Sequence, residues 1–384
     1  MIQIPKKLKK SLNALHPQMP KGTISDATSW VNQQRSKSKA DTMRGWVKPW
    51  VEEIHHEETI IFSQPNTLEE SIHPNFIKHY FATTSQSSIY VIYGARIIGR
   101  EGYVISPDNK VFEEFTYCST KPGNDYDVFY RLRLPAIETR SGWWATITYP
   151  DAAEFFHFEL ECFPRLSLLE KFEPILNGIV VPKNLKKSHL SLLKEIGFSD
   201  DRLLKIDSNS HIKFDNLIVP SFIAGKNIPA WVPTFYKKQF IHNAVKPFQL
   251  VYISREDALY RNIINSSEVE ELLMNLGFTK YVISTLSPIE QRELFSSAKI
   301  IVAPHGAALS NLVYSQSTLN LLEIFSPHHV DVTYWTIVQA ISGKYWYMLG
   351  TQTPRNKKLK QDFENILVDI EKLKKMINII IKSC

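Results

Sequence analysis

The stretch Ala298-Lys-Ile-Ile-Val-Ala-Pro-His-Gly-Ala-Ala-Leu-Ser-Asn-Leu312, followed by Leu321-Leu-Glu-Ile324, decides the fold class of this chain. Its run Ile300-Ile-Val302 is typical of a strand that is covered on both faces, as in a parallel sheet. A tight turn at His305-Gly306, a helix and a second strand are predicted to follow. The stretch therefore predicts a strand-helix-strand unit of an α/β domain.

Several residues of this unit predict a nucleotide site. Gly306 allows the backbone to approach a ligand closely, and the helix that begins at Ala307 offers free N–H groups to a phosphate. Glu323 is expected near the carboxyl end of the next strand, where open α/β sheets bind ligands and where a carboxylate can accept hydrogen bonds from a ribose diol. Asn311 lies inside the helix, and its spacing leaves a ligand contact and a structural role equally open.

The neighbouring segments continue the alternation of strands and helices. Strands are predicted at 249–254 and 281–284, with a helix at 267–276 between them. The next helix opens at Ser287-Pro-Ile-Glu290, which has the pattern of a capping box with proline in the first turn. The resulting order predicts a parallel, doubly wound sheet.

Two arginines are predicted to join the nucleotide site. Arg255 directly follows the strand at 249–254, so it is expected at the same sheet edge as His305 and Glu323. An arginine there can hold a pyrophosphate with two hydrogen bonds, whereas a plain surface arginine is the alternative. Arg261 follows closely, either as a second contact or as a support for the loop.

A second constellation lies in the segment 155–171, which has helical spacing. His157 and Glu161 are four residues apart, so on a helix they share a face. An imidazole beside a carboxylate is suited to removing a proton from a hydroxyl group. A hydrogen bond inside a packed helix explains the same spacing, and the sequence leaves both readings open.

Composition and charge limit the partners. The chain has 384 residues, 43% of them hydrophobic, which is enough for two domains of ordinary size. Its net charge of +6 is unevenly distributed along the sequence, because residues 1–50 contain ten Lys or Arg but only two Asp. This basic arm is predicted to contact an anionic membrane surface or, alternatively, to be a solvated tail. The remainder has no basic stripe, so nucleic acid is not an expected partner.

The cysteines favour a reducing cytoplasm, since Cys118, Cys162 and Cys384 have neither metal-ligand spacing nor a disulfide pattern. The N-terminus lacks the apolar core of a secretion signal, and no window reaches the roughly 20 apolar residues of a membrane span. Asp125-Tyr-Asp127 resembles a D-x-D metal motif, but the residues before it indicate a loop instead of a buried strand. No metal site and no cofactor are predicted.

With these residues assembled, the chain resembles glycosyltransferase family sixty-one from about Phe155 to Glu323. Three landmarks carry the resemblance: the helix with His157, Glu161 and Pro164-Arg165; Ser254-Arg255 with Arg261 and Asn265; and Pro304-His-Gly-Ala-Ala-Leu-Ser-Asn311 with Glu323. The sequence departs from the family pattern at Ala308, where glycine is common, and at Phe158, where tryptophan is common. Neither difference removes a chemical group.

The resemblance implies an α/β fold of GT-B type, in which two Rossmann-like domains face a cleft. It implies inverting, metal-independent transfer of a sugar from a nucleotide donor, usually UDP-linked, to a glycan or glycolipid. Glu161, aided by His157, would take the acceptor proton, while Arg255 would stabilise the leaving diphosphate. The expected place is the bacterial cytoplasm, in surface-polysaccharide synthesis, with peripheral contact at the inner face of the plasma membrane through residues 1–50.

The predicted domains are a basic arm at 1–50, an N-terminal acceptor-side domain at 51–230 and a C-terminal nucleotide-sugar domain at 231–355. A helix within 356–384 is expected to cross back and pack on the N-terminal domain. Two other functions stay open. A sugar-nucleotide epimerase of GT-B type would convert the donor without an acceptor, and a non-catalytic carbohydrate-binding protein would bind glycan but no nucleotide.

Overall fold

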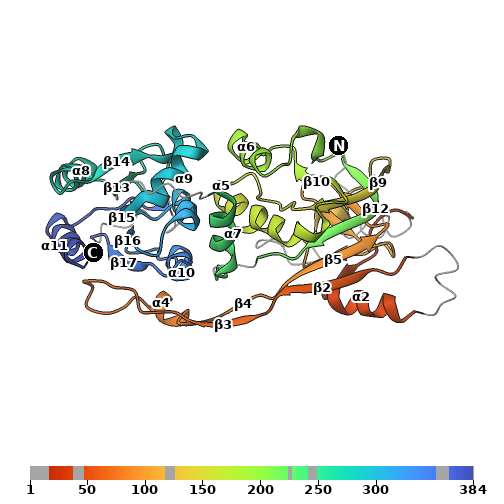
Figure 1. Cartoon of the computed structure of the whole chain (residues 1–384), viewed down its shortest axis with the longest axis horizontal. Coiled ribbons are helices and arrows are strands. Elements are labelled where there is room, and N and C mark those ends of the chain that lie inside the picture. Colours follow the sequence, from red (N-terminus) through yellow and green to blue (C-terminus); the bar gives the residue numbers. More distant parts are fainter. Residues whose placement is uncertain are drawn as a thin grey trace. The chain divides into compact units, whose positions relative to one another are not determined.

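The chain forms two compact units in the computed structural model, which is drawn in Figure 1. Unit 1 consists of Met1–Glu57 and Ser85–Ile223, and unit 2 of Glu58–Thr84 and Ala224–Cys384. The segment Glu58–Thr84 thus packs with the C-terminal part of the chain, whereas the sequence placed it within an N-terminal domain at 51–230. The structure describes residues 17–37, 47–116, 126–223, 227–240, 249–351 and 363–383.

Unit 1 is built around one large sheet. Its elements in chain order are β1 (Thr23–Ile24), α2 (Ala27–Ser36), β2 (Trp50–His55), β5 (Ser87–Tyr93), β6 (Arg96–Ile98), β7 (Tyr103–Ile105), β8 (Val111–Phe112), η2 (Asp127–Tyr130), β9 (Glu138–Thr146), α5 (Phe155–His157), η3 (Phe158–Cys162), η4 (Phe163–Phe172), β10 (Leu176–Pro182), α6 (Lys187–Glu195), η5 (Asp200–Arg202), β11 (Leu203–Ile206) and β12 (His211–Pro220). The strand order is β1-β8-β7-β6-β12-β9-β10-β11, and β5 pairs with both β12 and β2.

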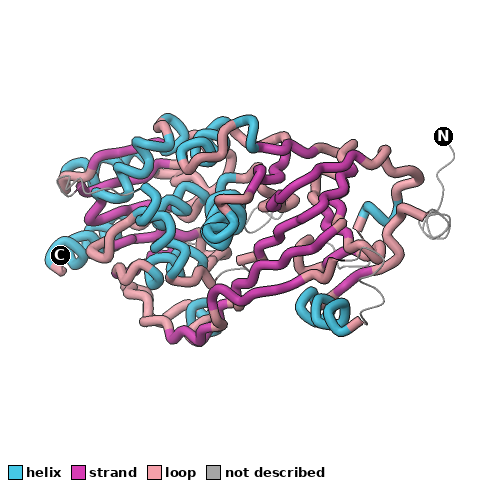
Figure 2. Tube along the Cα trace, turned by 45° about the vertical axis from the view of Figure 1, so that its right-hand side comes forward, coloured by secondary structure: helices cyan, strands magenta, loops and turns pink. Residues whose placement is uncertain are grey.

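This sheet is mixed, which corrects the expectation of a Rossmann-like N-terminal domain. Its strands β12, β9, β10 and β11 are parallel neighbours. However, β12 is antiparallel to β5 and β6, and β6 is antiparallel to β7. The extended sheet is visible as magenta strands in Figure 2. Because β9, β10 and β12 are parallel, their carboxyl ends lie at one edge of the sheet, where the helical segment α5 to η4 follows β9.

Part of the predicted basic arm is folded into unit 1. The helix α2 begins after Asp26, whose side chain accepts a hydrogen bond from the Ser29 backbone N–H and so caps the first turn. Trp30 and Val31 of this helix are buried in the core of unit 1. The predicted basic arm at 1–50 therefore includes a helix that belongs to the core of unit 1. Residues 1–16, which hold four of the lysines on which the membrane prediction depends, lie outside the described residues.

Unit 2 contains the predicted parallel sheet. Its elements are β3 (Glu58–Ile61), α4 (Pro74–Lys78), β4 (Phe81–Thr84), α7 (Trp231–Phe240), β13 (Gln249–Ser254), α8 (Ser266–Asn275), β14 (Thr279–Val282), η6 (Ile283–Thr285), α9 (Pro288–Ser297), β15 (Ala298–Pro304), η7 (Ala307–Tyr314), β16 (Asn320–Phe325), α10 (Thr333–Ala340), β17 (Lys344–Leu349) and α11 (Ile370–Lys382). The strand order β14-β13-β15-β16-β17, with parallel pairing throughout, is a doubly wound arrangement. The capping box at Ser287 and Glu290 is confirmed.

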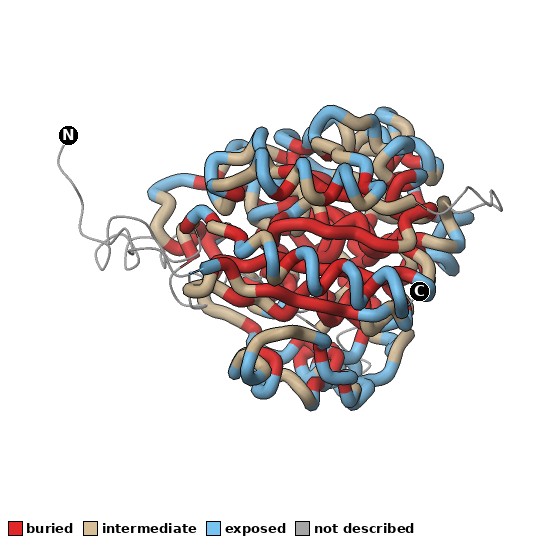
Figure 3. The backbone as a smooth tube through the Cα atoms, turned by 90° about the vertical axis from the view of Figure 1, so that its left-hand side faces the viewer, coloured by how far each residue is buried: buried red, intermediate tan, exposed pale blue. Residues whose placement is uncertain are grey.

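Helices cover both faces of this sheet, so its strands are buried between them (Figure 3). On one face, apolar residues of β15 to β17 pack against α8 and α11. On the other, the rings of Tyr345 and Tyr347 contact Phe76 of α4, which in turn contacts Trp335 of α10. Strands with this double cover need apolar residues on both sides, which is why Ile300-Ile-Val302 has no polar alternation.

The C-terminal helix α11 packs on unit 2. Its buried residues Leu373, Met376, Ile377 and Ile380 belong to the same core cluster as Val302 of β15. The expectation that this helix crosses back to the N-terminal domain is therefore corrected. An apolar stripe shows that a helix has a buried face, but the stripe does not say which sheet buries it. No helix of the described ranges is both long enough and apolar enough to span a bilayer.

Candidate active site

The residues predicted to hold a nucleotide lie where the strand order of unit 2 reverses. β13 and β15 are neighbours, but the chain continues from β13 to β14 on one side and from β15 to β16 on the other. Doubly wound sheets bind ligands at this point, outside the carboxyl ends of the strands. Arg255 directly follows β13, and His305 directly follows β15, so the structure brings both predicted residues to this place.

Arg255 lies directly against the backbone of Gly306. A Cβ atom added to Gly306 would overlap the guanidinium group of Arg255. Gly306 has an extended backbone with φ 174°, so the requirement for glycine is one of space and not of backbone conformation. The other end of the guanidinium is held by the Tyr260 carbonyl oxygen, which accepts a hydrogen bond from Nη2 at 3.2 Å.

A second cation, Arg261, lies close to the first. Burial, together with the charge of Arg261, lowers the pKa of Arg255 to about 10. Arg261 itself has φ 60°, a left-handed backbone that a non-glycine residue adopts only where its surroundings enforce it. Within the described part of the chain, the buried Nε atoms of both arginines have no hydrogen-bond partner. Two neighbouring cations with unused donors favour a bound anion.

The helix η7 adds further donors at this place. It begins at the exposed residue Ala307, directly after Gly306. No side chain of the described residues caps its first turn, so its initial N–H groups are free to bind an anion. Arg255, Arg261 and this helix start therefore form one positively polarised site.

His305 and Glu323 form a buried pair beside this site. The His305 Nδ1 and Glu323 Oε1 atoms are 2.6 Å apart, and the Tyr345 hydroxyl donates to Glu323 Oε2, also at 2.6 Å. Glu323 is 0% exposed, and burial raises its pKa although both neighbours act against this shift. The ring of Tyr334 lies 5.2 Å from the His305 ring.

Two residues predicted to contact the nucleotide are buried and have protein partners. Glu323 has no exposed surface, and its oxygens contact His305 and Tyr345. These contacts support a role beside His305, and the hydrogen bonds of Glu323 to a ribose diol stay a prediction. Asn311 is 3% exposed, and its Nδ2 donates to the Gln291 side chain and to the Ala308 carbonyl oxygen. Of the two roles left open for Asn311, the structural one is what these contacts support.

The second predicted pair, His157 and Glu161, is brought together in unit 1. Nδ1 of His157 lies 2.6 Å from Oε2 of Glu161. Burial opposes the charged imidazole, but the hydrogen bond and charge of Glu161 outweigh it, so the pKa of His157 is raised. Glu161 lies in η3, a π-helical turn, a helix type that is often found at functional sites.

Arg165 holds the segment that carries this pair. Its guanidinium group donates to the carbonyl oxygens of Thr146, Thr148 and Pro220, and only 1% of its surface is exposed. Thr146 and Pro220 end the parallel neighbours β9 and β12. Arg165 therefore fastens η4 to the carboxyl edge of the unit 1 sheet, and so fixes the position of His157 and Glu161.

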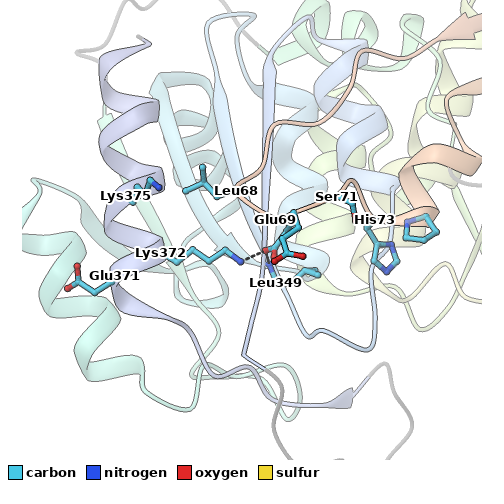
Figure 4. A pocket seen from close by; sticks show the side chains of 10 residues that line it. Leu68, Glu69, Ser71, His73, Leu349, Glu371, Lys372 and Lys375 are labelled. Carbon is cyan, nitrogen blue, oxygen red and sulfur yellow. Dashed lines mark hydrogen bonds and ion pairs between the residues drawn. The ribbon is translucent and has the colours of Figure 1, made fainter.

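A cavity of about 830 Å³ lies elsewhere in unit 2 (Figure 4). It is lined by Leu68, Glu69, Glu70, Ser71, His73, Pro74, Leu349, Glu371, Lys372 and Lys375. Glu69 Oε1 pairs with Lys372 Nζ at 2.6 Å and accepts a hydrogen bond from the Leu349 N–H. These contacts attach α11 to the end of β17, so the polar centre of the cavity is already used for structure.

Among the described residues, no group of three or more His, Cys, Asp or Glu side chains is arranged to hold a metal ion. Of the D-x-D sequence, Asp125 lies outside the described residues. Asp127 accepts hydrogen bonds from Arg131 and Tyr103.

The region that contains both constellations matches a known protein family. Residues 155–322 match the family model described as Glycosyltransferase 61, which confirms the predicted resemblance and nearly its limits. The match runs from α5 to β16 and includes His157, Glu161, Arg255 and His305. No curated protein matches the chain.

Proposed function

Since residues 155–322 belong to glycosyltransferase family 61, we propose that the protein transfers a sugar from a nucleotide donor, a UDP-sugar, to a glycan or glycolipid acceptor with inversion at the anomeric carbon. The observation that carries this proposal is the pair of arginines at the strand reversal of unit 2. Their unpartnered Nε atoms and the free start of η7 suit a diphosphate.

On the donor side, Arg255 and Arg261 take the place that a divalent cation has in metal-dependent transferases. As the bond between the anomeric carbon and the diphosphate oxygen breaks, negative charge accumulates on that oxygen. Guanidinium groups that are already in place stabilise this charge without reorganisation in the transition state. The contact of Arg255 with Gly306 and the Tyr260 carbonyl supports such preorganisation.

On the acceptor side, Glu161 acts as the base. The acceptor oxygen forms a bond to the anomeric carbon from the face opposite the diphosphate, and its proton passes to Glu161. His157 donates to Glu161, and its side chain is 31% exposed compared with 9% for Glu161. A largely buried carboxylate that is oriented by a partly exposed imidazole is suited to accept a proton from an incoming hydroxyl.

The donor proposal can be tested by calorimetry of UDP, GDP and CMP without metal, using the full chain and two variants. Arg255→Gln should weaken UDP binding at least about tenfold, because a charge-assisted contact to the diphosphate is lost. Lys344→Gln is the matched control, since Lys344 begins β17 at the opposite, amino edge of the sheet. It removes the same charge and should leave affinity unchanged.

Selective UDP binding that depends on Arg255 supports the proposal and directs attention to UDP-sugars. Equal weakening in both variants would indicate a general charge effect, and the assignment of the site would then be wrong. Glycan binding without any nucleotide binding would instead favour a non-catalytic carbohydrate-binding protein.

A further inference from the structure

We propose that Tyr345 is a positioning residue for the donor site, acting on His305 through Glu323. This inference rests on the proposed function, because His305 is taken to lie beside the bound nucleotide. Tyr345 lies outside the region that matches the family, and its hydroxyl contacts Glu323 instead of an arginine of the donor site.

The position of Tyr345 in the sheet makes the contact possible. In the pairing of β16 with β17, the residue opposite Glu323 is Tyr347, whereas Tyr345 is opposite Leu321. All four side chains share one face of the sheet, since they are two residues apart on each strand. The Tyr347 hydroxyl is used elsewhere, because it accepts from the His73 N–H at 2.9 Å. The Tyr345 hydroxyl therefore reaches Glu323 diagonally.

The backbone on which Tyr345 stands is itself fixed. Its carbonyl oxygen accepts hydrogen bonds from the backbone N–H and the side-chain amide of Asn66, at 2.9 and 3.1 Å. Its ring is 1% exposed and contacts Phe76. A tyrosine held in this way presents its hydroxyl at a defined point, so it can orient a neighbouring group.

Glu323 needs this hydroxyl because its carboxylate has no access to water. A buried carboxylate is stable only when its oxygens accept hydrogen bonds. Tyr345 satisfies Oε2, which leaves Oε1 to accept from Nδ1 of His305. Both distances of 2.6 Å are those of strong contacts to a charged acceptor.

The contact with Glu323 fixes which nitrogen of His305 carries the proton and how its ring is oriented. With the Nδ1 proton committed to Glu323, the second ring nitrogen Nε2 is the atom left for the ligand, and the ring cannot turn without breaking the contact. His305 directly precedes Gly306, on which Arg255 rests. Tyr345 thus acts at a distance on the geometry of the residues around the diphosphate.

The test compares Tyr345→Phe with Tyr347→Phe in the full chain, by NMR of ¹⁵N-labelled histidine at one fixed pH. The His305 signals are identified among those of the 12 histidines by their loss in His305→Gln. Each tyrosine variant removes one hydroxyl from the same face of β17, but only Tyr345 contacts Glu323. We expect the ring nitrogen signals of His305 to move in Tyr345→Phe and to stay in Tyr347→Phe.

UDP affinity is measured on the same proteins and should fall about tenfold in Tyr345→Phe, because the ring of His305 is then no longer held in one orientation. Unchanged His305 signals in Tyr345→Phe would overturn the inference, and so would equal changes in both variants, which would reflect a loosened strand. If Tyr345→Phe does not fold, Glu323→Gln replaces it and must move the same signals. If the wild type binds no UDP, the proposed function fails, while the histidine signals still decide whether Tyr345 positions His305.

Discussion

The chain carries two imidazole–carboxylate pairs with the same geometry and different surroundings. In His305–Glu323 of unit 2 and in His157–Glu161 of unit 1, Nδ1 lies 2.6 Å from a carboxylate oxygen. The side chains of the first pair are 10% and 0% exposed, and those of the second are 31% and 9% exposed. Glu323 has a second donor in Tyr345, whereas in the described residues only His157 donates to the Glu161 side chain. Burial and a second donor suit a positioning role, and partial exposure suits proton transfer.

The largest expected effect is on chemistry at the less buried pair, His157–Glu161. Glu161→Gln keeps the shape of the side chain but removes its basicity, so transfer from a UDP-sugar should fall by about 10²- to 10⁴-fold. Donor binding should stay at the wild-type level, because Glu161 lies in unit 1. Initial rates and calorimetry with UDP measure the two quantities. Full activity in this variant would remove Glu161 from the reaction.

A large effect on stability is expected at the buried pair. Glu323→Ala leaves the donors of His305 and Tyr345 without their acceptor in the core, which should cost about 3 kcal/mol or more of the free energy of unfolding. Glu161→Ala removes a largely buried carboxylate, but its partner His157 is 31% exposed and can be solvated, so the cost should be smaller, about 1 to 2 kcal/mol. Urea unfolding of both variants makes the comparison, and equal shifts of the midpoint would contradict the difference in roles.

A smaller effect is expected where the buried pair meets the arginines. Gly306→Ala places a methyl group where the Arg255 guanidinium lies, so Arg255 must move, and UDP affinity should fall about tenfold. Gly277→Ala is a glycine control from the same unit: its Cβ would meet only a Leu250 methyl at 3.9 Å, but the φ of 87° makes the substitution strained. It therefore controls for a loss of stability away from Arg255, and UDP affinity should stay at the wild-type level. If Gly306→Ala binds UDP as the wild type does, Arg255 does not contact the diphosphate.

The smallest effect is the pH dependence of the exposed pair. The raised pKa of His157 means that the folded state binds this proton more tightly than the unfolded chain, whose histidine has a pKa of about 6.5. The resulting stabilisation is present below that value and is lost as pH rises through the folded pKa. Because the pair is partly exposed, it should amount to less than about 0.5 kcal/mol. Urea unfolding of wild type and His157→Asn at about pH 5.5 and pH 9 should show a difference only at the lower pH.

The sequence predicted the parts of the fold that depend on local patterns. The strand of Ile300-Ile-Val302, the turn at His305-Gly306 and the capping box at Ser287 follow from residues that are close in the chain, and all are present. The pairing of His157 with Glu161 follows from a spacing of four on a helix. Each of these predictions needed only the geometry of one element.

What the sequence did not predict depends on contacts between distant elements. Glu323 was placed correctly near the end of a strand. Its hydrogen bond with Tyr345, however, is a diagonal contact between β16 and β17, and the spacing of residues in the sequence does not predict it. The packing of α11 on unit 2 and the mixed sheet of unit 1 likewise follow from which surfaces meet. An apolar face of a helix or strand predicts that another element covers it. Which element that is depends on how the whole chain folds.

The insertion of Glu58–Thr84 into unit 2 has a consequence for how the protein is made. The polypeptide passes between the units after Glu57, after Thr84 and after Ile223, so neither unit is a continuous piece of chain. During synthesis, residues 58–84 leave the ribosome long before β16 and β17 exist, while Phe76 has its ring partners at Trp335 and Tyr345. All residues of unit 1 have been synthesised once residue 223 has left the ribosome, so unit 1 can fold while residues 58–84 still lack their partners in unit 2. A truncated gene beginning at residue 224 would encode a C-terminal half without Phe62 and Phe76, so the aromatic surface around Trp335 would be open to aggregation.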